Sequence, residues 1–277
     1  MQSTSKPKGL AKIWREIKRP FQRVRRYFWR KERDYENAMQ QYIAKQRLLA
    51  TNTIQAIVSA SVLHPKTFSQ FRKTHQGQDV VIVATGPTVK NYKRINGAIH
   101  IGVNRAFMIE NIDLRYLFMH DYVAVESYIK EANRYKGESC TKFYGKSIPL
   151  RHTDEANALH YRICPGPNIG KGKEEKVTPS MFCHVLDSEP FRVFGSTIFV
   201  AMQFALWTDP RTIYLVGCDC SSDGYFDGQP NDDTAMPFVI DAWQQLKRFA
   251  QLHYPETKIL SINPVRLKGL FDEYKQT

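Results

Sequence analysis

The chain has 277 residues, 42% of them hydrophobic, which is enough for one folded α/β domain with an appendage. Five cysteines, an odd number without Cys-x-x-Cys spacing, argue against a disulfide framework. No window approaches the roughly 18 apolar residues of a membrane span, and the N-terminus lacks the apolar core of a secretory signal. We therefore expect a cytoplasmic protein that is soluble or peripheral to the inner membrane.

The net charge of +13 is concentrated at the N-terminus. Residues 1–33 hold twelve Lys and Arg against Glu16 and Glu32, a charge of +10. Apolar residues between these charges recur at helical spacing: Leu10, Ile13, Trp14, Ile17, Phe21, Val24, Tyr27 and Phe28. Such a helix is typical of one that lies on an anionic membrane surface. Packing of the apolar stripe on the body is the alternative, and nucleic-acid binding is disfavoured because basic residues thin out beyond residue 33.

The segment that follows is also predicted to be helical. Pro20 is expected to kink or divide the first helix. The apolar spacing of residues 34–63, without Gly or Pro, predicts another helix or two that end before Pro65. We therefore predict a basic amphipathic helical arm over residues 1–75 and a Rossmann-like domain over residues 76–277.

Past residue 79 the sequence alternates between short β-branched runs and longer helical stretches. The predicted strands are residues 80–84, 98–103, 114–119, 192–194, 212–216 and 258–262, and the predicted helices are residues 123–135, 196–207 and 235–253. This alternation predicts an α/β fold with a doubly wound, mainly parallel sheet. Residues 137–191, rich in Pro, Gly and mixed charges, break the rhythm and are predicted to form an irregular lid.

The first predicted strand ends in a turn with the features of a nucleotide-type site. In open α/β sheets ligands bind beyond the carboxyl ends of the strands. Gly86 allows the backbone to approach a ligand, and after Pro87 the hydroxyl of Thr88 and nearby amides can bind phosphate oxygens. The turn is neither the Gly-x-Gly-x-x-Gly dinucleotide fingerprint nor a phosphate loop, so common dehydrogenase and ATPase functions lose their best support.

Two later positions add polar groups to this predicted edge. Asn104, after the second strand, can bind a base, ribose or sugar, or can cap a helix, and Arg105 can hold a phosphate or carboxylate. Ser196 and Thr197 open a predicted helix, where their hydroxyls can serve as a cap or as part of a phosphate cradle.

The strongest predicted strand is followed by Asp219 and a loop rich in acids and hydroxyls. One loop carboxylate could be a general base, and Tyr225 could donate to a departing phosphate. Metal sites are disfavoured, because the pair His120-Asp121 is more often a turn and Cys218 and Cys220 lack a partner set with ligand spacing.

The order of these motifs resembles the small bacterial sialyltransferases of glycosyltransferase family 42, and more broadly some flagellin-modifying bacterial glycosyltransferases. The resemblance covers about residues 79–268. It rests on Gly86-Pro87-Thr88, Val103-Asn104-Arg105, Gly195-Ser196-Thr197, the run from Ile213 to Asp219, and Asn263-Pro264.

The resemblance implies a metal-independent glycosyltransferase without a cofactor, which takes sialic acid or a Kdo-like sugar from a CMP-linked donor. Its acceptor would be a cell-surface glycan or a lipid-linked glycan. By position, the resemblance implies that Gly86 and Thr88 lie near the donor phosphate and that Asn104 lies near the nucleotide. It implies that Ser196 and Thr197 contact the donor sugar or the cytidine. Asp219 would lie in the nucleotide pocket, and Tyr225 would lie at the departing phosphate.

One departure from the family concerns the base. The histidine that the family places in the loop after the Gly-x-Asp turn is missing here, since the chain has no histidine between Asp219 and Leu252. The carboxylates of Asp223 and Asp227 are therefore the predicted candidates for the acceptor side. The remaining substitutes are Asp232, Asp233 and His184, whereas His253 is expected to be structural.

Two other functions stay open. One is a pterin or nucleotide diphosphokinase-like phosphotransferase, which would require Mg²⁺ and ATP. The other is a non-catalytic binding module that keeps the fold without the base.

Overall fold

The computed structural model describes residues 8–120, 126–146, 158–164, 176–231 and 234–276. Contacts divide the chain into two compact units, residues 1–51 and residues 52–277. The predicted boundary between residues 75 and 76 concerns independent folding and stays a prediction. The two units are described separately.

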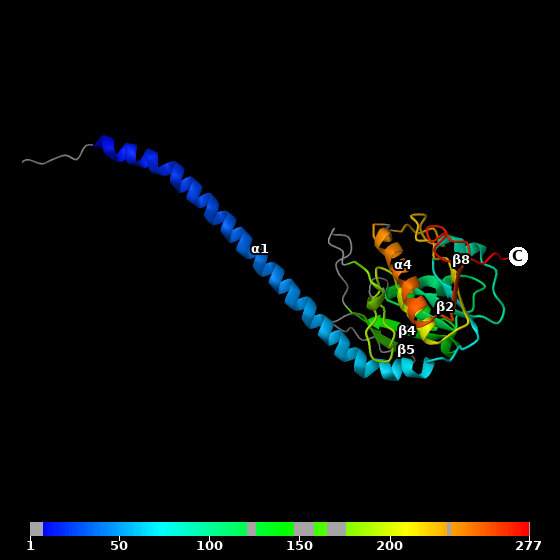
Figure 1. Cartoon of the computed structure of the whole chain (residues 1–277). Coiled ribbons are helices and arrows are strands. Elements are labelled where there is room, and N and C mark those ends of the chain that lie inside the picture. Colours follow the sequence, from blue (N-terminus) through cyan, green and yellow to red (C-terminus); the bar gives the residue numbers. More distant parts are fainter. Residues whose placement is uncertain (1–7, 121–125, 147–157, 165–175, 232–233, 277) are drawn as a thin grey trace, which may run out of the picture. The chain divides into compact units, whose positions relative to one another are not determined.

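The first helix, α1, is longer than expected. It runs from Lys8 to Phe68 without interruption, through both Pro20 and Pro65 (Figure 1). The expected division at Pro20 and the expected end before Pro65 are therefore wrong. A proline removes one backbone hydrogen bond, but the Lys, Arg, Glu, Gln, Leu and Ala residues that dominate this stretch are strong helix formers and continue the helix.

The second unit is built on an eight-stranded sheet in which every neighbouring pair is parallel. The strand order is β5-β4-β3-β2-β1-β6-β7-β8. The strands are β1 Asp79–Val83, β2 Ile99–Val103, β3 Tyr116–Met119, β4 Thr141–Lys146, β5 Ala158–Arg162, β6 Thr212–Val216, β7 Lys258–Ser261 and β8 Asp272–Glu273. This confirms the predicted α/β, Rossmann-like class.

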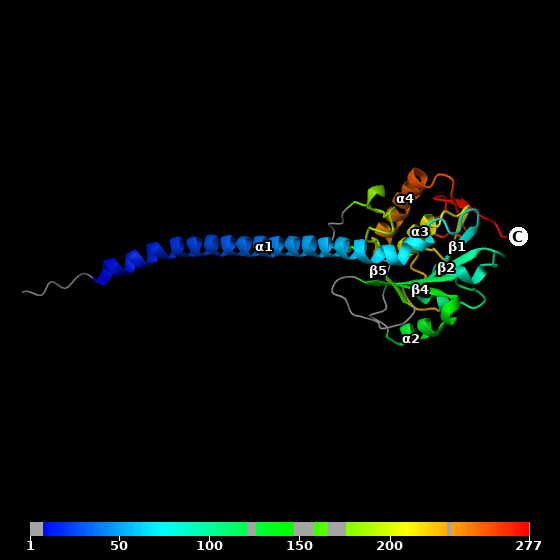
Figure 2. The same cartoon turned by 90° about the horizontal axis from the view of Figure 1, so that it is seen from below.

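Helices cover both faces of this sheet. Within the second unit, α3 Ile198–Trp207 and α4 Met236–His253 lie on one face and α2 Glu126–Arg134 on the other (Figure 2). Along β1 the side chains alternate between the two layers: Val80 and Ile82 pack with α3 and α4, whereas Val81 and Val83 pack in the layer that includes Ala132 of α2. Both sides of β1 are therefore buried, as expected for a central parallel strand.

Five short 3₁₀ turns are found in the described residues. After strands come η2 Pro87–Asn91, η3 Asn104–Met108 and η5 Pro179–Met181, and after helices α1 and α2 come η1 Ser69–Phe71 and η4 Gly137–Ser139.

The predicted irregular stretch contains two strands of the sheet, so the description of residues 137–191 as irregular is wrong in part. β4 and β5 interrupt the β-branched pattern with charged and small residues, which hid them. Lys142 of β4 is buried and its Nζ donates to the Gly137 carbonyl at 2.9 Å. A Cβ on Gly145 would lie 2.6 Å from the Tyr161 ring of β5. Residues 147–157 and 165–175 of the predicted lid lie outside the described residues.

Other boundaries differ from expectation. The predicted strand at residues 192–194 is absent from the described structure, because only Phe191 bridges to Ile163 and the chain then turns. Strand β8 was not predicted. The predicted helix at residues 123–135 is α2, and its expected first residues, 123–125, lie outside the described residues.

Candidate functional site

The candidate site lies at the point where the chain order of the sheet reverses. From β1 the chain builds outward through β2 to β5, and then returns to place β6 on the other side of β1. The loops after β1 and β6 therefore run to opposite sides, which leaves a crevice at the carboxyl ends of the strands. A cavity of about 300 Å³ occupies this place.

Six of the eleven predicted site residues line this cavity, and they come from four separate segments. They are Gly86, Asn104, Ser196, Thr197, Asp219 and Tyr225. Apolar and sulfur-bearing walls are added by Cys218, Cys220, Met236, Val239 and Trp243. A cavity with apolar walls and a few converging polar groups is typical of a small-molecule site.

The turn after β1 is fastened to the turn after β6. The amide of Gly86 donates to the Gly217 carbonyl at 2.9 Å, and a Cβ on Gly86 would lie 2.6 Å from the Asp219 carboxylate. The φ of Gly86 is −68°, so the glycine is required by space and not by backbone conformation.

Both carboxylate oxygens of Asp219 accept hydrogen bonds at this junction. One of its oxygens accepts from the Thr88 amide at 2.9 Å, and the other accepts from the Thr88 hydroxyl. The residue is only 4% exposed, and burial raises the pKa of its carboxyl. Asp219 therefore reaches the cavity wall while holding the two strand ends together.

Asn104 joins three elements at the cavity. Its Oδ1 accepts from the amide of His120, just after β3, and its Nδ2 donates to Thr197 Oγ1 at the start of α3, both at 3.3 Å. Its φ of 47° is in the left-handed region that asparagine tolerates better than most residues. The N-cap position of η3 is held by Val103 and Asn104 is the first residue of the turn, so the predicted alternative in which Asn104 is the cap residue is wrong.

Helix α3 directs its N-terminus toward the cavity. All ten of its residues are buried, which explains why it carries no amphipathic pattern. The Ser196 hydroxyl accepts from the Ile198 amide at 3.4 Å, and the amides of Phe199 and Val200 bond to the carbonyls of Ser196 and Thr197. Because these amides are already bonded, this segment can bind an anion mainly through its hydroxyl protons and the positive end of the helix dipole.

The loop after β6 folds back over the cavity. The Phe226 amide donates to the Thr85 carbonyl at 2.8 Å, which closes the loop onto the turn after β1. The Tyr225 hydroxyl donates to Asn231 Oδ1 at 3.1 Å, and Asn231 Nδ2 donates to the Ser221 carbonyl at 3.1 Å. Asn231 also lines the cavity, and the sequence reasoning missed it because nothing in its neighbourhood marks it.

Arg105 and Asp227 form an ion pair beside this loop. The shortest N–O distance is 2.5 Å, and the two side chains are 16% and 20% exposed. The Arg105 guanidinium also lies 4.7 Å from the centre of the Tyr225 ring. Neither charged residue lines the cavity itself, whereas Tyr225 does.

The remaining predicted residues lie at the margin or elsewhere. Pro87 and Thr88 are not among the residues that line the cavity. Asp223 is near enough to Asp219 to contribute to the raised pKa of that carboxyl. Asp232 and Asp233 lie outside the described residues.

His184 and His253 belong to a separate cavity of about 370 Å³, where their rings stack at 4.9 Å. That cavity is lined by the ends of segments that enter β1, β6 and β7, so it belongs to the amino edge of the sheet.

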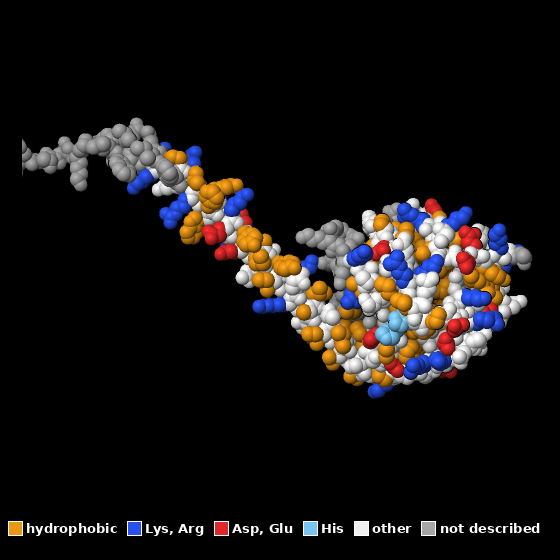
Figure 3. Space-filling view, in the orientation of Figure 1, with side chains coloured by type: hydrophobic (Ala, Val, Ile, Leu, Met, Phe, Trp, Pro, Cys, Tyr) orange, Lys and Arg blue, Asp and Glu red, His pale blue; other side chains and the backbone are white. Residues whose placement is uncertain are grey.

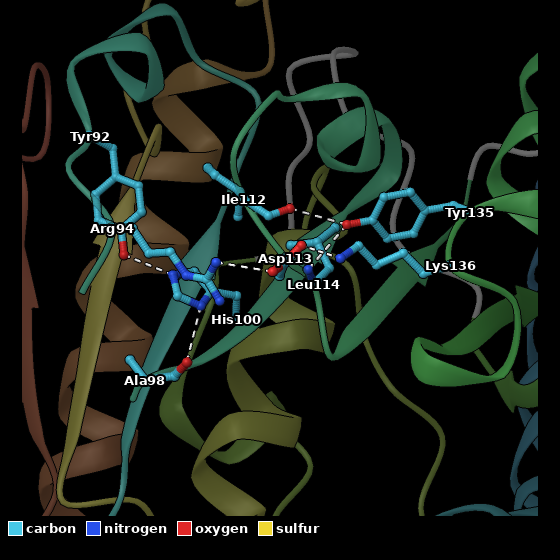
Figure 4. A network of polar contacts seen from close by, with 9 residues as sticks. All are labelled: Tyr92, Arg94, Ala98, His100, Ile112, Asp113, Leu114, Tyr135 and Lys136. Carbon is cyan, nitrogen blue, oxygen red and sulfur yellow. Dashed lines mark hydrogen bonds and ion pairs between the residues drawn. The ribbon is translucent and has the colours of Figure 1, made fainter. Parts of the chain in front are cut away.

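A polar network lies where the chain enters β2 and β3 (Figure 4). Its members bond to one another: Tyr92 to His100, His100 to Ala98, Arg94 and Lys136 to Asp113, and Tyr135 to Ile112 and Leu114. These groups satisfy each other, which indicates a structural role.

Three observations on the described residues concern metal binding, reactive thiols and membrane spans. They contain no cluster of three or more His, Cys, Asp or Glu side chains that could hold a metal ion. Cys218 and Cys220 are free thiols in the cavity wall. No helix among them combines the length and apolar character needed to cross a bilayer.

No protein-family model matches the sequence, and no curated protein matches it. Among solved structures, the chain is similar to a MAf glycosyltransferase from Magnetospirillum magneticum AMB-1, with a TM-score of 0.44 and 12% identity over 73% of this chain. It is also similar to the sialyltransferase CstII from Campylobacter jejuni, solved with the substrate analogue CMP-3FNeuAc, with a TM-score of 0.44 and 13% identity over 72% of this chain. The matched part spans 36% of the first of these chains and 86% of the second. Both similarities are too remote to bear on activity, so the function is argued from the site.

Proposed function

We propose that the protein is a glycosyltransferase that moves a sialic acid or Kdo-like sugar from a CMP-linked donor to a glycan or glycolipid acceptor, without a metal or cofactor. The observation that carries this proposal is the cavity at the reversal point of the sheet. There the Gly86 turn, Asn104, the Ser196-Thr197 hydroxyls and Tyr225 converge on one space of about 300 Å³. These are the groups that the motif order assigns to a nucleotide-linked sugar.

The polar edge of the cavity is better suited to bind a donor phosphate than to bind a cation. Hydroxyl protons of Ser196 and Thr197 and the N-terminal end of α3 offer hydrogen bonds and partial positive charge. The Tyr225 hydroxyl, held by Asn231, can turn to donate to the phosphate oxygen that leaves with CMP.

The transfer needs a proton acceptor for the attacking hydroxyl. The acceptor oxygen bonds to the anomeric carbon, the bond from that carbon to the phosphate oxygen breaks, and the hydroxyl proton passes to a base. The Asp227 carboxylate is already engaged by Arg105 in an ion pair. We therefore assign the role of general base to Asp223. Asp227 is assigned a positioning role, because it holds Arg105 beside Tyr225.

The donor class is tested by thermal unfolding of the full chain with CMP, UDP, GDP or ATP, each with and without Mg²⁺. A nucleotide at 100 times its dissociation constant adds about 2.7 kcal/mol to stability. Stabilisation by CMP without Mg²⁺ supports the proposal. Stabilisation by ATP with Mg²⁺ alone would instead favour the phosphotransferase, and binding without hydrolysis or transfer of a CMP-linked sugar would favour the non-catalytic module.

The same proposal places the protein at the cytoplasmic face of a bacterial inner membrane, held by residues 1–33. Exposed aromatic side chains support this placement: Tyr27, Phe28 and Trp29 are each more than half exposed on α1. Around them are arginines and lysines such as Arg25, Arg26 and Lys31, which suit an anionic surface.

A further inference from the structure

The middle of α1 carries a symmetric arrangement of charges that the proposed function does not use. Within residues 34–47 the charged residues are Asp34, Glu36, Lys45 and Arg47, so the segment has no net charge. All four are exposed, and none of them forms an ion pair with another described residue. This segment lies wholly in the first unit and, unlike residues 1–33, lacks the excess of basic residues that would favour an anionic membrane.

The spacing sorts these charges onto two flanks of the helix. Asp34 and Lys45 are eleven residues apart, about three turns, so they share one flank, and Glu36 and Arg47 share another for the same reason. Residues 34 and 36 differ by about 200° around the axis, so the two flanks lie on opposite sides of Tyr35.

An exposed apolar seam runs between the flanks. Tyr35 is 67% exposed, Met39 39% and Tyr42 60%, and their spacing of four and three residues keeps them on one side of the helix. Apolar side chains can be seen along this part of α1 (Figure 3). A seam bordered by charges is the pattern by which helices choose a partner and its direction.

We infer that residues 34–47 of α1 pair antiparallel with the same segment of a second copy of this chain. In an antiparallel pair the two-fold axis places each flank against the same flank of the other copy, and the second helix runs in the opposite direction. With residue 35 of one copy level with residue 46 of the other, Asp34 lies within about 3 Å in height of Lys45 of the second copy, and Glu36 within about 3 Å of Arg47 of the second copy. A parallel pair brings opposite flanks together at equal height, so Asp34 would meet Glu36 and Lys45 would meet Arg47, which is repulsive.

The inference is independent of the glycosyltransferase proposal, and its first test is the oligomeric state of the full chain by sedimentation at low salt. We expect a dimer. The variant D34K/E36K should raise the dissociation constant of the dimer at least about tenfold, because attraction on both flanks becomes repulsion. The variant D34K/E36K/K45E/R47E should restore the dimer. A control variant, E110K/E138K, changes the net charge as much as the first at exposed positions of the second unit and should leave the dimer unchanged.

The direction is tested by cross-linking. Mixed Y35C and Q46C proteins should form a disulfide-linked dimer, because residues 35 and 46 of the two copies lie at the same height. Either variant alone should not, since two copies of residue 35 are then about 16 Å apart along the axis, beyond disulfide reach. A monomeric full chain, a monomeric fourfold variant or cross-linking of Y35C alone would each overturn the inference.

Discussion

Asn104 shows how one side chain can serve both the fold and the site. Its amide links the ends of β2 and β3 to the start of α3, and it lines the cavity in a left-handed backbone conformation. A substitution here therefore has two separable effects, on ligand contacts and on backbone conformation.

We predict that Asn104→Ala weakens cytidine nucleotide binding by at least about 1 kcal/mol, the order of one lost buried hydrogen bond. It should also lower the free energy of unfolding by about 1–2 kcal/mol, because alanine is strained at positive φ. Asn104→Gly is the matched variant, since it removes the same amide without that strain. Calorimetric titration that finds unchanged affinity in both variants would remove Asn104 from the binding site.

The two candidate carboxylates of the loop after β6 should separate in kinetics. Asp223→Asn should lower turnover at least about 100-fold with nearly unchanged donor affinity, as expected for a lost general base. Asp227→Asn should instead alter donor affinity, because it releases Arg105 from its ion pair beside Tyr225. If both variants keep normal turnover, the base lies elsewhere, and Asp232 and Asp233 are the next to replace.

At the scale of elements, the N-terminal part of α1 is separable from the sheet. Contacts place residues 1–51 in their own unit, while residues 52–277 hold the buried core. Deleting residues 1–33 should therefore leave the unfolding temperature of the core unchanged but abolish sedimentation with anionic vesicles. Uncharged vesicles are the control, because the full chain should bind them much more weakly. Full sedimentation of the truncated chain would show that another surface is the anchor.

At the scale of the whole molecule, two buried histidines couple stability to pH. His64 donates from Nδ1 to the Leu186 carbonyl at 3.0 Å, and its Nε2 accepts from the Arg162 amide at 2.8 Å. His100 donates from Nδ1 to the Ala98 carbonyl, so its Nε2 accepts from the Tyr92 hydroxyl at 2.8 Å. Both rings are held neutral, and burial lowers the pKa of each from 6.5 to about 4.

We predict that the free energy of unfolding falls as the pH drops from about 6.5 to about 4. In that window the unfolded chain binds protons at these histidines and the folded chain does not. Each fully titrated histidine costs on the order of 3 kcal/mol. Denaturant unfolding at pH 7, 6 and 5 should show this loss, and His100→Gln should reduce the slope. A stability that is constant or rises toward pH 5 would contradict the prediction.

The sequence by itself determined the parts of this protein that depend on local patterns. Runs such as Val80–Val83 and Ile213–Val216 are apolar and rich in β-branched residues, as strands buried on both faces require, so β1 and β6 could be predicted from the sequence pattern. The rule that ligands bind at the carboxyl edge of a parallel sheet pointed to the candidate residues after β1, β2 and β6, of which Gly86, Asn104 and Asp219 line the cavity. The continuity of α1 through Pro20 and Pro65 could not be predicted from local rules, because the penalty of each proline is local and is outweighed by the helix formers on either side.

Only the tertiary structure decided which polar groups meet. Asn231 supports Tyr225, and Arg105 pairs with Asp227 across 122 residues of sequence, contacts for which no local pattern exists. Strand β4 was hidden because Lys142 and Gly145 break the strand pattern. The Lys142 ammonium is bound by the Gly137 carbonyl, and the Tyr161 ring leaves no room for a Cβ at residue 145. The local sequence shows the spacing at which residues are buried in a helix or strand. Which residues of distant strands come into contact depends on the order of strands in the sheet, and that order is a property of the folded chain.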